Sequence, residues 1–375
     1  MRTTNRLPRR EFLSVALGAP AVFSAAISDA QEHTRGSLRP IIFVWLDGGL
    51  TQLETFDPKP DAPVEIRGEG KAIRSKEGTL FGEQLPKLAA LEKEFTILRA
   101  VQNTSGEHET GTTEFMGKTA FARYGGSGGL QYGFIHPSQG SRVYDKAHQT
   151  ASADFRFQWK GGAFNCPNLE TAVDARRHTE RRALLKVFQR GAVDPLQHIA
   201  MDLLSGDAEK LHKAFTLNPR DVEAYAPEGA NPEPGMPEAF LLAQQLAEQG
   251  LPFTTLHYGG WDYHNAMRSA LAKRLPVFDH ALATLIRQTR ERRTVIAACS
   301  EFGRTPKIND FGGRDHWPNA GSALITVGSG VFGSTDRSGD AASGIVTPEK
   351  LRKTILAAAG HTFPLREYVW EIVKS

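Results

Sequence analysis

The sequence predicts an α/β domain in which a mostly parallel sheet is covered by helices on both faces. Apolar runs that stop at glycines alternate along the chain with segments of helical periodicity. The runs are apolar on both faces, as expected of buried parallel strands. With 375 residues, 40% of them hydrophobic, the chain is long enough for a sizeable core. The alternation favours a single α/β/α domain over residues 38–375.

The elements follow in order. The first strand, PIIFVWLDGG at 40–49, is a β-branched and aromatic stretch that ends in glycines. Further strands are predicted at 95–101, 251–260, 294–303 and 322–330, and helices at 82–94, 198–215, 237–250, 266–292 and 347–360. Residues 121–180 are rich in Gly, Ser and basic residues with weak periodicity. We interpret them as an insertion over one end of the sheet.

Composition excludes several classes of protein. The formal net charge is +3, of which residues 1–30 contribute +2, so the remainder lacks the concentrated basic face of a nucleic-acid-binding protein. Two cysteines, Cys166 and Cys299, are too few for a disulfide framework. No segment offers the ~20 uninterrupted apolar residues of a spanning helix. We therefore expect no nucleic-acid partner and no stable membrane span.

The N-terminus resembles a twin-arginine export signal. Arg9 and Arg10 precede an uncharged stretch over 13–27 and a small-x-small sequence that ends at Ala30. The alternative is an amphipathic helix, but a glycine and a proline within the stretch would interrupt it. We expect residues 1–30 to be a signal peptide read by the twin-arginine translocase, and the mature protein to be periplasmic or extracellular. Such substrates cross the membrane folded, which suits a protein that acquires a metal first.

Acidic residues and histidines gather where the predicted strands end or begin. Asp47 follows the first strand, Asp262 and His264 follow the third, Glu301 ends the fourth, and Asp315 and His316 precede the fifth. In open α/β sheets, ligands bind outside the carboxyl ends of the strands. Carboxylate plus imidazole is a ligand set for Zn²⁺, Mn²⁺ or Fe, and carboxylate-rich sets also hold Mg²⁺ or Ca²⁺.

Each of these clusters also has a purely structural interpretation. Asp47 before glycines suits a turn. Asp262 and His264 alternate, so on an extended segment both face one side, for hydrogen bonding or for ligation. Asp315 with His316 is either a cap or half of a metal site. Glu301, after an apolar strand, must be paired or bound if it is buried. Together, four such clusters favour a metal centre.

Several motifs resemble the signature segments of the domain-of-unknown-function 1501 family. They are WLDGG (45–49), QLETFDPKPDAP (52–63), GGWDYH (259–264), EFGRTPKIN (301–309) and GGRDHWPNAGSALITVG (312–328). The resemblance runs from about residue 38 to the C-terminus. Members of the family are exported, often with twin-arginine signals, and are described as related to alkaline phosphatases and sulfatases.

The resemblance implies an alkaline-phosphatase-like α/β/α sandwich with two divalent metal ions at the strand ends. By analogy, Asp262, His264 and His316 would hold one ion. Asp47, Glu301 and Asp315 would hold or frame the other. The metals compatible with these ligands are Zn²⁺, Mn²⁺, Mg²⁺ and Ca²⁺.

The chain departs from the superfamily where its working enzymes carry a nucleophile. The corresponding stretch is NTSGEHETGTTEFMGK (103–118), and the nucleophile position falls near Glu107 or His108. Neither is an ordinary nucleophile for ester transfer. Thr110, Thr112 and Thr113 lie close by as alternatives, and His108 could be a further metal ligand.

Three functions remain open from the sequence. The first is an exported metal-dependent hydrolase of a phosphate or sulfate ester of a small molecule or glycan. Metal-bound water, or one of the hydroxyls at 110–113, would attack, and Arg304 and Arg314 would clamp the anionic group. The second is an exported binding or assembly protein that keeps the fold and a structural metal. The third is a metal-dependent lyase or isomerase.

Overall fold

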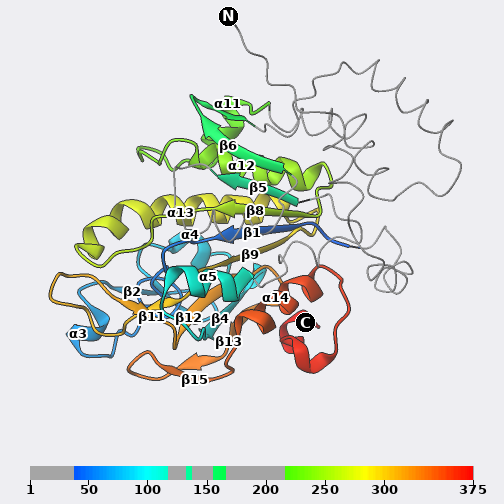
Figure 1. Cartoon of the computed structure of the whole chain (residues 1–375). Helices are drawn as coiled ribbons and strands as arrows, with labels where there is room; N and C mark the ends of the chain where they lie inside the picture. The colour runs from blue at the N-terminus through cyan, green and yellow to red at the C-terminus, as the bar shows by residue number, and fades with distance from the viewer. Residues whose placement is uncertain (1–37, 117–131, 137–154, 166–215, 375) are drawn as a thin grey trace, which may run out of the picture. The chain divides into compact units, whose positions relative to one another are not determined.

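The computed structural model describes residues 38–116, 132–136, 155–165 and 216–374 (Figure 1). The predicted signal peptide (1–30) and the predicted helix over 198–215 lie outside these residues. Residues 38–375 group into one compact unit. Within the described ranges, no helix is both long and apolar enough to cross a membrane.

One large sheet forms the middle of the domain, with nine strands among the described residues. Their order is β13-β4-β12-β9-β1-β8-β5-β6-β7, with β1 at Ile41–Trp45, β4 at Thr96–Val101, β5 at Tyr132–His136, β6 at Phe155–Lys160, β7 at Ala163–Asn165, β8 at Phe253–His257, β9 at Val295–Cys299, β12 at Gly321–Ile325 and β13 at Gly330–Phe332. Only β12 and β7 among these run antiparallel to their neighbours. The predicted α/β class with a mostly parallel sheet is confirmed.

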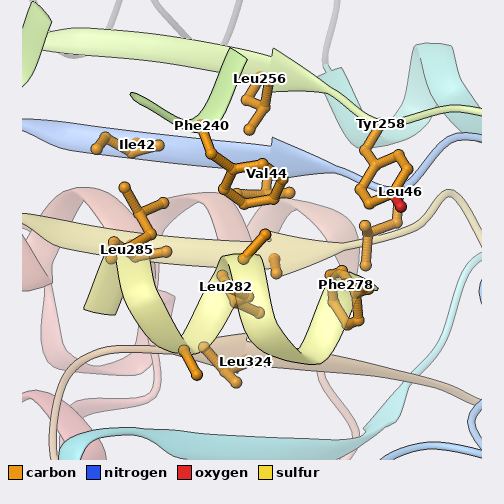
Figure 2. Packing of buried hydrophobic residues seen from close by; sticks show 14 of the residues in the cluster. Ile42, Val44, Leu46, Phe240, Leu256, Tyr258, Phe278, Leu282, Leu285 and Leu324 are labelled. Carbon is orange, nitrogen blue, oxygen red and sulfur yellow. The ribbon is translucent and has the colours of Figure 1, made fainter. Parts of the chain in front are cut away.

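Helices cover both faces of this sheet. Successive side chains of β1 point to opposite faces, and the apolar residues on each face pack against a different set of helices. Ile42 and Val44 pack with helices α12 (Met236–Glu248) and α13 (Met267–Thr289), as Figure 2 shows. Phe43 and Trp45 pack with residues of α5 (His108–Met116), α14 (Pro348–Ala358) and α15 (Trp370–Val373) on the other face. The architecture is therefore the predicted α/β/α sandwich.

The smaller elements lie around this frame. They are α3 (Val64–Arg67), β2 (Ala72–Arg74), β3 (Leu80–Gly82), α4 (Pro86–Ala89), a 3-10 turn at Glu92–Glu94, α11 (Pro219–Glu223), β10 (Gly303–Arg304), β11 (His316–Trp317), β14 (Ser334–Thr335), β15 (Ala341–Ser343) and a 3-10 turn at Leu365–Glu367. Pro86 opens α4, since proline suits the first helical position. The helix predicted over 82–94 is correspondingly shorter. Thr347 caps α14 by accepting a hydrogen bond from the backbone N–H of Lys350.

Two parts of the sheet differ from the sequence expectation. The described residues within 121–180 extend the sheet as β5, β6 and β7, with β5 pairing in parallel with β8, where an insertion was expected. The strand predicted at 322–330 is two strands, because the chain leaves the sheet after Ile325 and returns at Gly330 on the far side of β4. Gly328 and Gly330 have φ of 62° and 88°, which permits that change of direction.

Strand direction decides where the site forms. β1 runs parallel to β8 and β9, and β12 runs antiparallel to both β9 and β4. The carboxyl ends of β1, β4, β8 and β9 therefore meet at one edge. The start of β12 lies at that same edge, so the segment that precedes it arrives there too.

Candidate metal centre

Three segments bring one carboxylate and three imidazoles to this edge. Asp262 and His264 follow β8, and His108 is the first residue of α5, which follows β4. His316 lies in β11, where it pairs with Arg304 of β10. These three segments are far apart in the sequence, so only the fold brings them together.

The three imidazoles converge on the carboxylate of Asp262. The Nε2 atom of His108 lies 3.3 Å from Asp262 Oδ2. The Nε2 atoms of His264 and His316 lie 3.0 and 3.2 Å from Asp262 Oδ1. One ligand atom each from His108, Asp262 and His316 lies within 4.8 Å of the others, and His264 Nε2 is 2.9 Å from His316 Nε2. Imidazole and carboxylate donors at this spacing suit Zn²⁺ or Mn²⁺.

Each imidazole uses its other nitrogen to contact an oxygen of the protein. The Nδ1 atom of His108 lies 2.7 Å from Glu301 Oε1, and that of His264 lies 2.8 Å from Asp315 Oδ1. The Nδ1 atom of His316 lies 2.6 Å from the carbonyl oxygen of Gly106. An oxygen acceptor at Nδ1 favours a proton there, so that Nε2 is the nitrogen from which a cation would displace a proton. Metal-ligating histidines are oriented in this way.

The charges of the centre shift two pKa values in opposite directions. Burial lowers the pKa of His108, but its hydrogen bonds to Asp262 and Glu301 outweigh burial and raise the pKa to about 9. Burial raises the pKa of Asp262, but hydrogen bonds from His108, His316 and Arg304 outweigh it and hold that pKa far below its usual range. The Asp262 carboxylate is therefore ionised at neutral pH and attracts cations.

Glu301 lies behind His108 and is buried. The backbone N–H of Gly48 donates to both of its carboxylate oxygens, at 2.9 and 3.2 Å. Burial raises the pKa of Glu301, the charge of Asp47 adds to that shift, and the hydrogen bond with His108 opposes it. The side chain of Asn103 donates to the Glu301 carbonyl at 2.7 Å and fixes the backbone at that point. Glu301 thus fixes the orientation of the His108 ring through its contact with Nδ1.

Asp47 is also buried, and its charge acts on Glu301. Its Oδ2 atom is 3.2 Å from Nε2 of His257, the last residue of β8. Sequence reasoning missed His257, although an imidazole at the end of an apolar strand is a signal that could have identified it. Gly48, next to Asp47, has φ of 108°, and a Cβ there would lie 2.8 Å from the backbone nitrogen of Asp262. Glycine therefore lets the turns after β1 and β8 meet.

The two arginines predicted to clamp substrate are buried and form hydrogen bonds within the protein. Arg304 is 1% exposed, and its guanidinium donates to the carbonyls of Gly48, Gly49 and Arg314 and to Asp262 Oδ1, the last at 2.5 Å. Arg314 is fully buried and pairs with Glu54 at 2.5 Å. Buried guanidinium groups need such partners, and these leave the donors engaged within the protein.

The threonines of α5 are placed differently from His108. Thr110 and Thr113 are exposed, whereas Thr112 is buried. Thr112 lies one helical turn beyond His108, deeper in the domain. The side chain of α5 that contacts Asp262 is the imidazole of His108.

The chain has distant structural counterparts. The crystal structure of Ps i-CgsB is 12% identical with a TM-score of 0.39, and the match covers 88% of this chain and 74% of that one. A protein in the alkaline phosphatase superfamily from Vibrio parahaemolyticus is 11% identical with a TM-score of 0.38, covering 87% and 67%. Alkaline phosphatase from the Antarctic bacterium TAB5 is 12% identical with a TM-score of 0.36, covering 80% and 95%.

No curated protein matches the chain in sequence. A family model does match, over residues 39–155 and 164–364, which is most of the chain. Its description is a protein of unknown function, DUF1501. The chain belongs to the DUF1501 family.

Proposed function

We propose that the protein is an exported, metal-dependent hydrolase of phosphate or sulfate esters. The observation that carries the proposal is the arrangement of three imidazoles whose Nδ1 atoms contact protein oxygens and whose Nε2 atoms converge on Asp262. Mutual repulsion of neutral ring nitrogens disfavours such convergence unless a cation or a proton lies between them. His264 and His316, with Nε2 atoms 2.9 Å apart, illustrate this most directly.

Asp262 would be the shared ligand of the centre. Its Oδ1 atom faces His264 and His316, and its Oδ2 atom faces His108. Together, His108, Asp262, His264 and His316 would hold the divalent cations. Glu301 and Asp315 would act as outer partners that keep the imidazoles in place.

A bound divalent cation would supply a Lewis acid for the ester oxygens and would lower the pKa of water. The protein chain holds the ligand atoms for that cation in place. His108 enters at the point where related enzymes carry a nucleophile, held by Glu301 on one side and facing Asp262 on the other. Direct attack by water is the proposed route, because the exposed Thr110 and the buried Thr112 do not share the placement of His108.

Export is the second part of the proposal and rests on the sequence of residues 1–30. Replacing Arg9 and Arg10 together by lysine should leave the full-length precursor in the cytoplasm, because this signal is read by a receptor. Unchanged trimming and export of the double variant would contradict it. The substrate would then be an ester met in the periplasm or outside the cell, on a small molecule or a glycan.

Turnover tests the hydrolase directly. Purified protein should be loaded with Zn²⁺ or Mn²⁺ and assayed with p-nitrophenyl phosphate and p-nitrophenyl sulfate. We expect hydrolysis of at least one ester, abolished by chelation and by His316→Ala. Metal binding without turnover of either ester would instead favour a binding protein with a structural metal.

A further inference from the structure

The turn that carries Asp262 is joined to the loop after β1 by a hydrogen bond from the backbone N–H of Trp261 to the carbonyl of Asp47, at 3.2 Å. Between the end of β8 and Asp262 the chain passes through Gly259 and Gly260, and Gly260 has φ of 86°. Two successive glycines give such a segment many accessible conformations. A ligand that follows two glycines binds a metal well only if contacts with the turn hold the glycine backbone in one conformation.

Arg274, from the second turn of α13, meets this turn along its length. Its guanidinium donates to the carbonyl of Gly260 at 3.2 Å and to the carbonyl of Gly259. The same group lies over the rings of Tyr258 and Trp261, with its central carbon 4.8 and 4.7 Å from the ring centroids. One planar group therefore contacts four successive residues.

The guanidinium is held in that position from its other side. Glu233, in the loop before α12, accepts from Nη1 at 2.8 Å and from Nη2 at 3.0 Å. The Arg274 side chain is only 13% exposed, whereas the Glu233 side chain is 43% exposed. A lysine would keep the charge, but it lacks the planar fork that bonds two carbonyls and stacks on two rings.

We propose that Arg274 is a positioning residue of the metal centre, which it supports by fixing the turn that presents Asp262. The hydrogen bonds of Arg274 go to the carbonyls of the turn, so its effect on the centre passes through the backbone. The inference rests on the proposed metal centre. Partners of this kind typically contribute 10–100-fold to metal affinity.

The test compares Arg274→Lys with Arg287→Lys, a control at an exposed position of the same helix. Zn²⁺ affinity is measured by calorimetry, and amide hydrogen exchange is measured on the metal-free proteins. We expect Arg274→Lys to bind Zn²⁺ about 10–100-fold more weakly. We also expect faster exchange at Trp261 and Asp262, with β1 and β9 unchanged. The control should match the wild type in both measurements.

Two results would overturn the proposal. One is an Arg274→Lys variant whose Zn²⁺ affinity and whose amide exchange rates at Trp261 and Asp262 equal those of the wild type. The other is loss of exchange protection throughout β1 and β9, which would make Arg274 a support of the whole fold. If the wild type itself binds no Zn²⁺, the proposed metal centre fails. Exchange in the metal-free protein then still decides whether Arg274 holds the turn.

Discussion

The Oδ1 atom of Asp262 lies 3.2 Å from the Nε2 atom of His316, a residue 54 positions further along the chain. The same oxygen is 3.0 Å from Nε2 of His264 and 2.5 Å from a guanidinium nitrogen of Arg304. This one carboxylate oxygen therefore collects donors from three segments. Removing the Asp262 charge should therefore weaken the contacts with His264, His316 and Arg304 together.

Glu301→Gln should weaken metal binding without unfolding the protein. The amide can still accept from the Gly48 N–H, but it no longer offers a charged acceptor to His108. Loss of an outer partner of this kind costs about 10–100-fold in metal affinity. Competition with a chromophoric chelator measures it, with the exposed Glu349→Gln as the control. Equal affinity in wild type and Glu301→Gln would remove Glu301 from the centre.

The metal-free protein should lose stability as the pH rises through 9. Because the folded-state pKa of His108 is raised to about 9, the folded protein binds more protons than the unfolded chain between pH 6.5 and 9. The stabilisation by protonated His108 is complete below pH 6.5 and is lost above 9. Urea unfolding of wild type and His108→Gln across this range measures it. A difference between the two that is independent of pH would contradict the assignment.

Metal affinity should follow the opposite trend over the same range. A cation at the centre must displace the proton of His108, so apparent affinity should increase as the pH rises towards 9. Zn²⁺ titrations at several pH values, with proton release recorded in buffers of different ionisation enthalpy, check this. Affinity that falls between pH 6.5 and 8 would be inconsistent with ligation by His108.

Asp279 should give a second pH dependence. It is buried in α13, and its carboxylate accepts from the backbone N–H groups of Lys87 and Leu88 at the start of α4. Burial outweighs these bonds and raises its pKa to about 6. The stabilisation by the neutral acid is therefore complete below the unfolded value near 4 and is lost as the pH rises through 6.

Unfolding of wild type and Asp279→Asn at several pH values tests this. Between pH 4 and 7 the wild type should lose up to about 3 kcal/mol relative to the variant, which cannot ionise. A constant difference across this range would show that Asp279 titrates normally.

Phe278→Ala should destabilise the domain by about 3–5 kcal/mol, because it opens a cavity between α13 and the sheet. The ring is fully buried and lies 6.1 Å from the ring of Tyr258, which Figure 2 also labels. It lies 5.5 Å from the ring of Trp261. Urea unfolding measures the loss. Phe311→Ala is the matched control, since Phe311 is 76% exposed and its removal should change stability by less than about 0.5 kcal/mol.

The sequence predicted the layers of the domain because apolar periodicity reports which faces of an element are buried. It did not predict strand direction, since β12 is apolar on both faces whichever way it runs. The prediction that Asp315 and His316 lie near Asp262 and His264 relied on strand ends meeting at one edge. They do meet there, with His264 bonded to Asp315.

What the sequence could not provide is the division of roles within the cluster. Whether Glu301 faces Asp262 directly or stands behind His108 depends on the path of the turn after β9 and on where α5 begins. The hydrogen bonds of the Arg304 guanidinium likewise depend on the tertiary structure. Its partners are carbonyls of residues about 255 positions earlier, which no local pattern records.

Metal content tests the proposed metal centre directly. Wild type, Asp262→Asn and His316→Ala are saturated with Zn²⁺ or Mn²⁺, dialysed, and analysed for metal per chain. His361→Ala is the control, because it lies next to the pairing of Ala359 with Arg39 at the start of β1, away from the site. We expect one or two ions per chain in wild type and control, and loss of metal from the other two variants while their folds remain intact. A folded wild-type protein that retains no ion after saturation would contradict the metal centre.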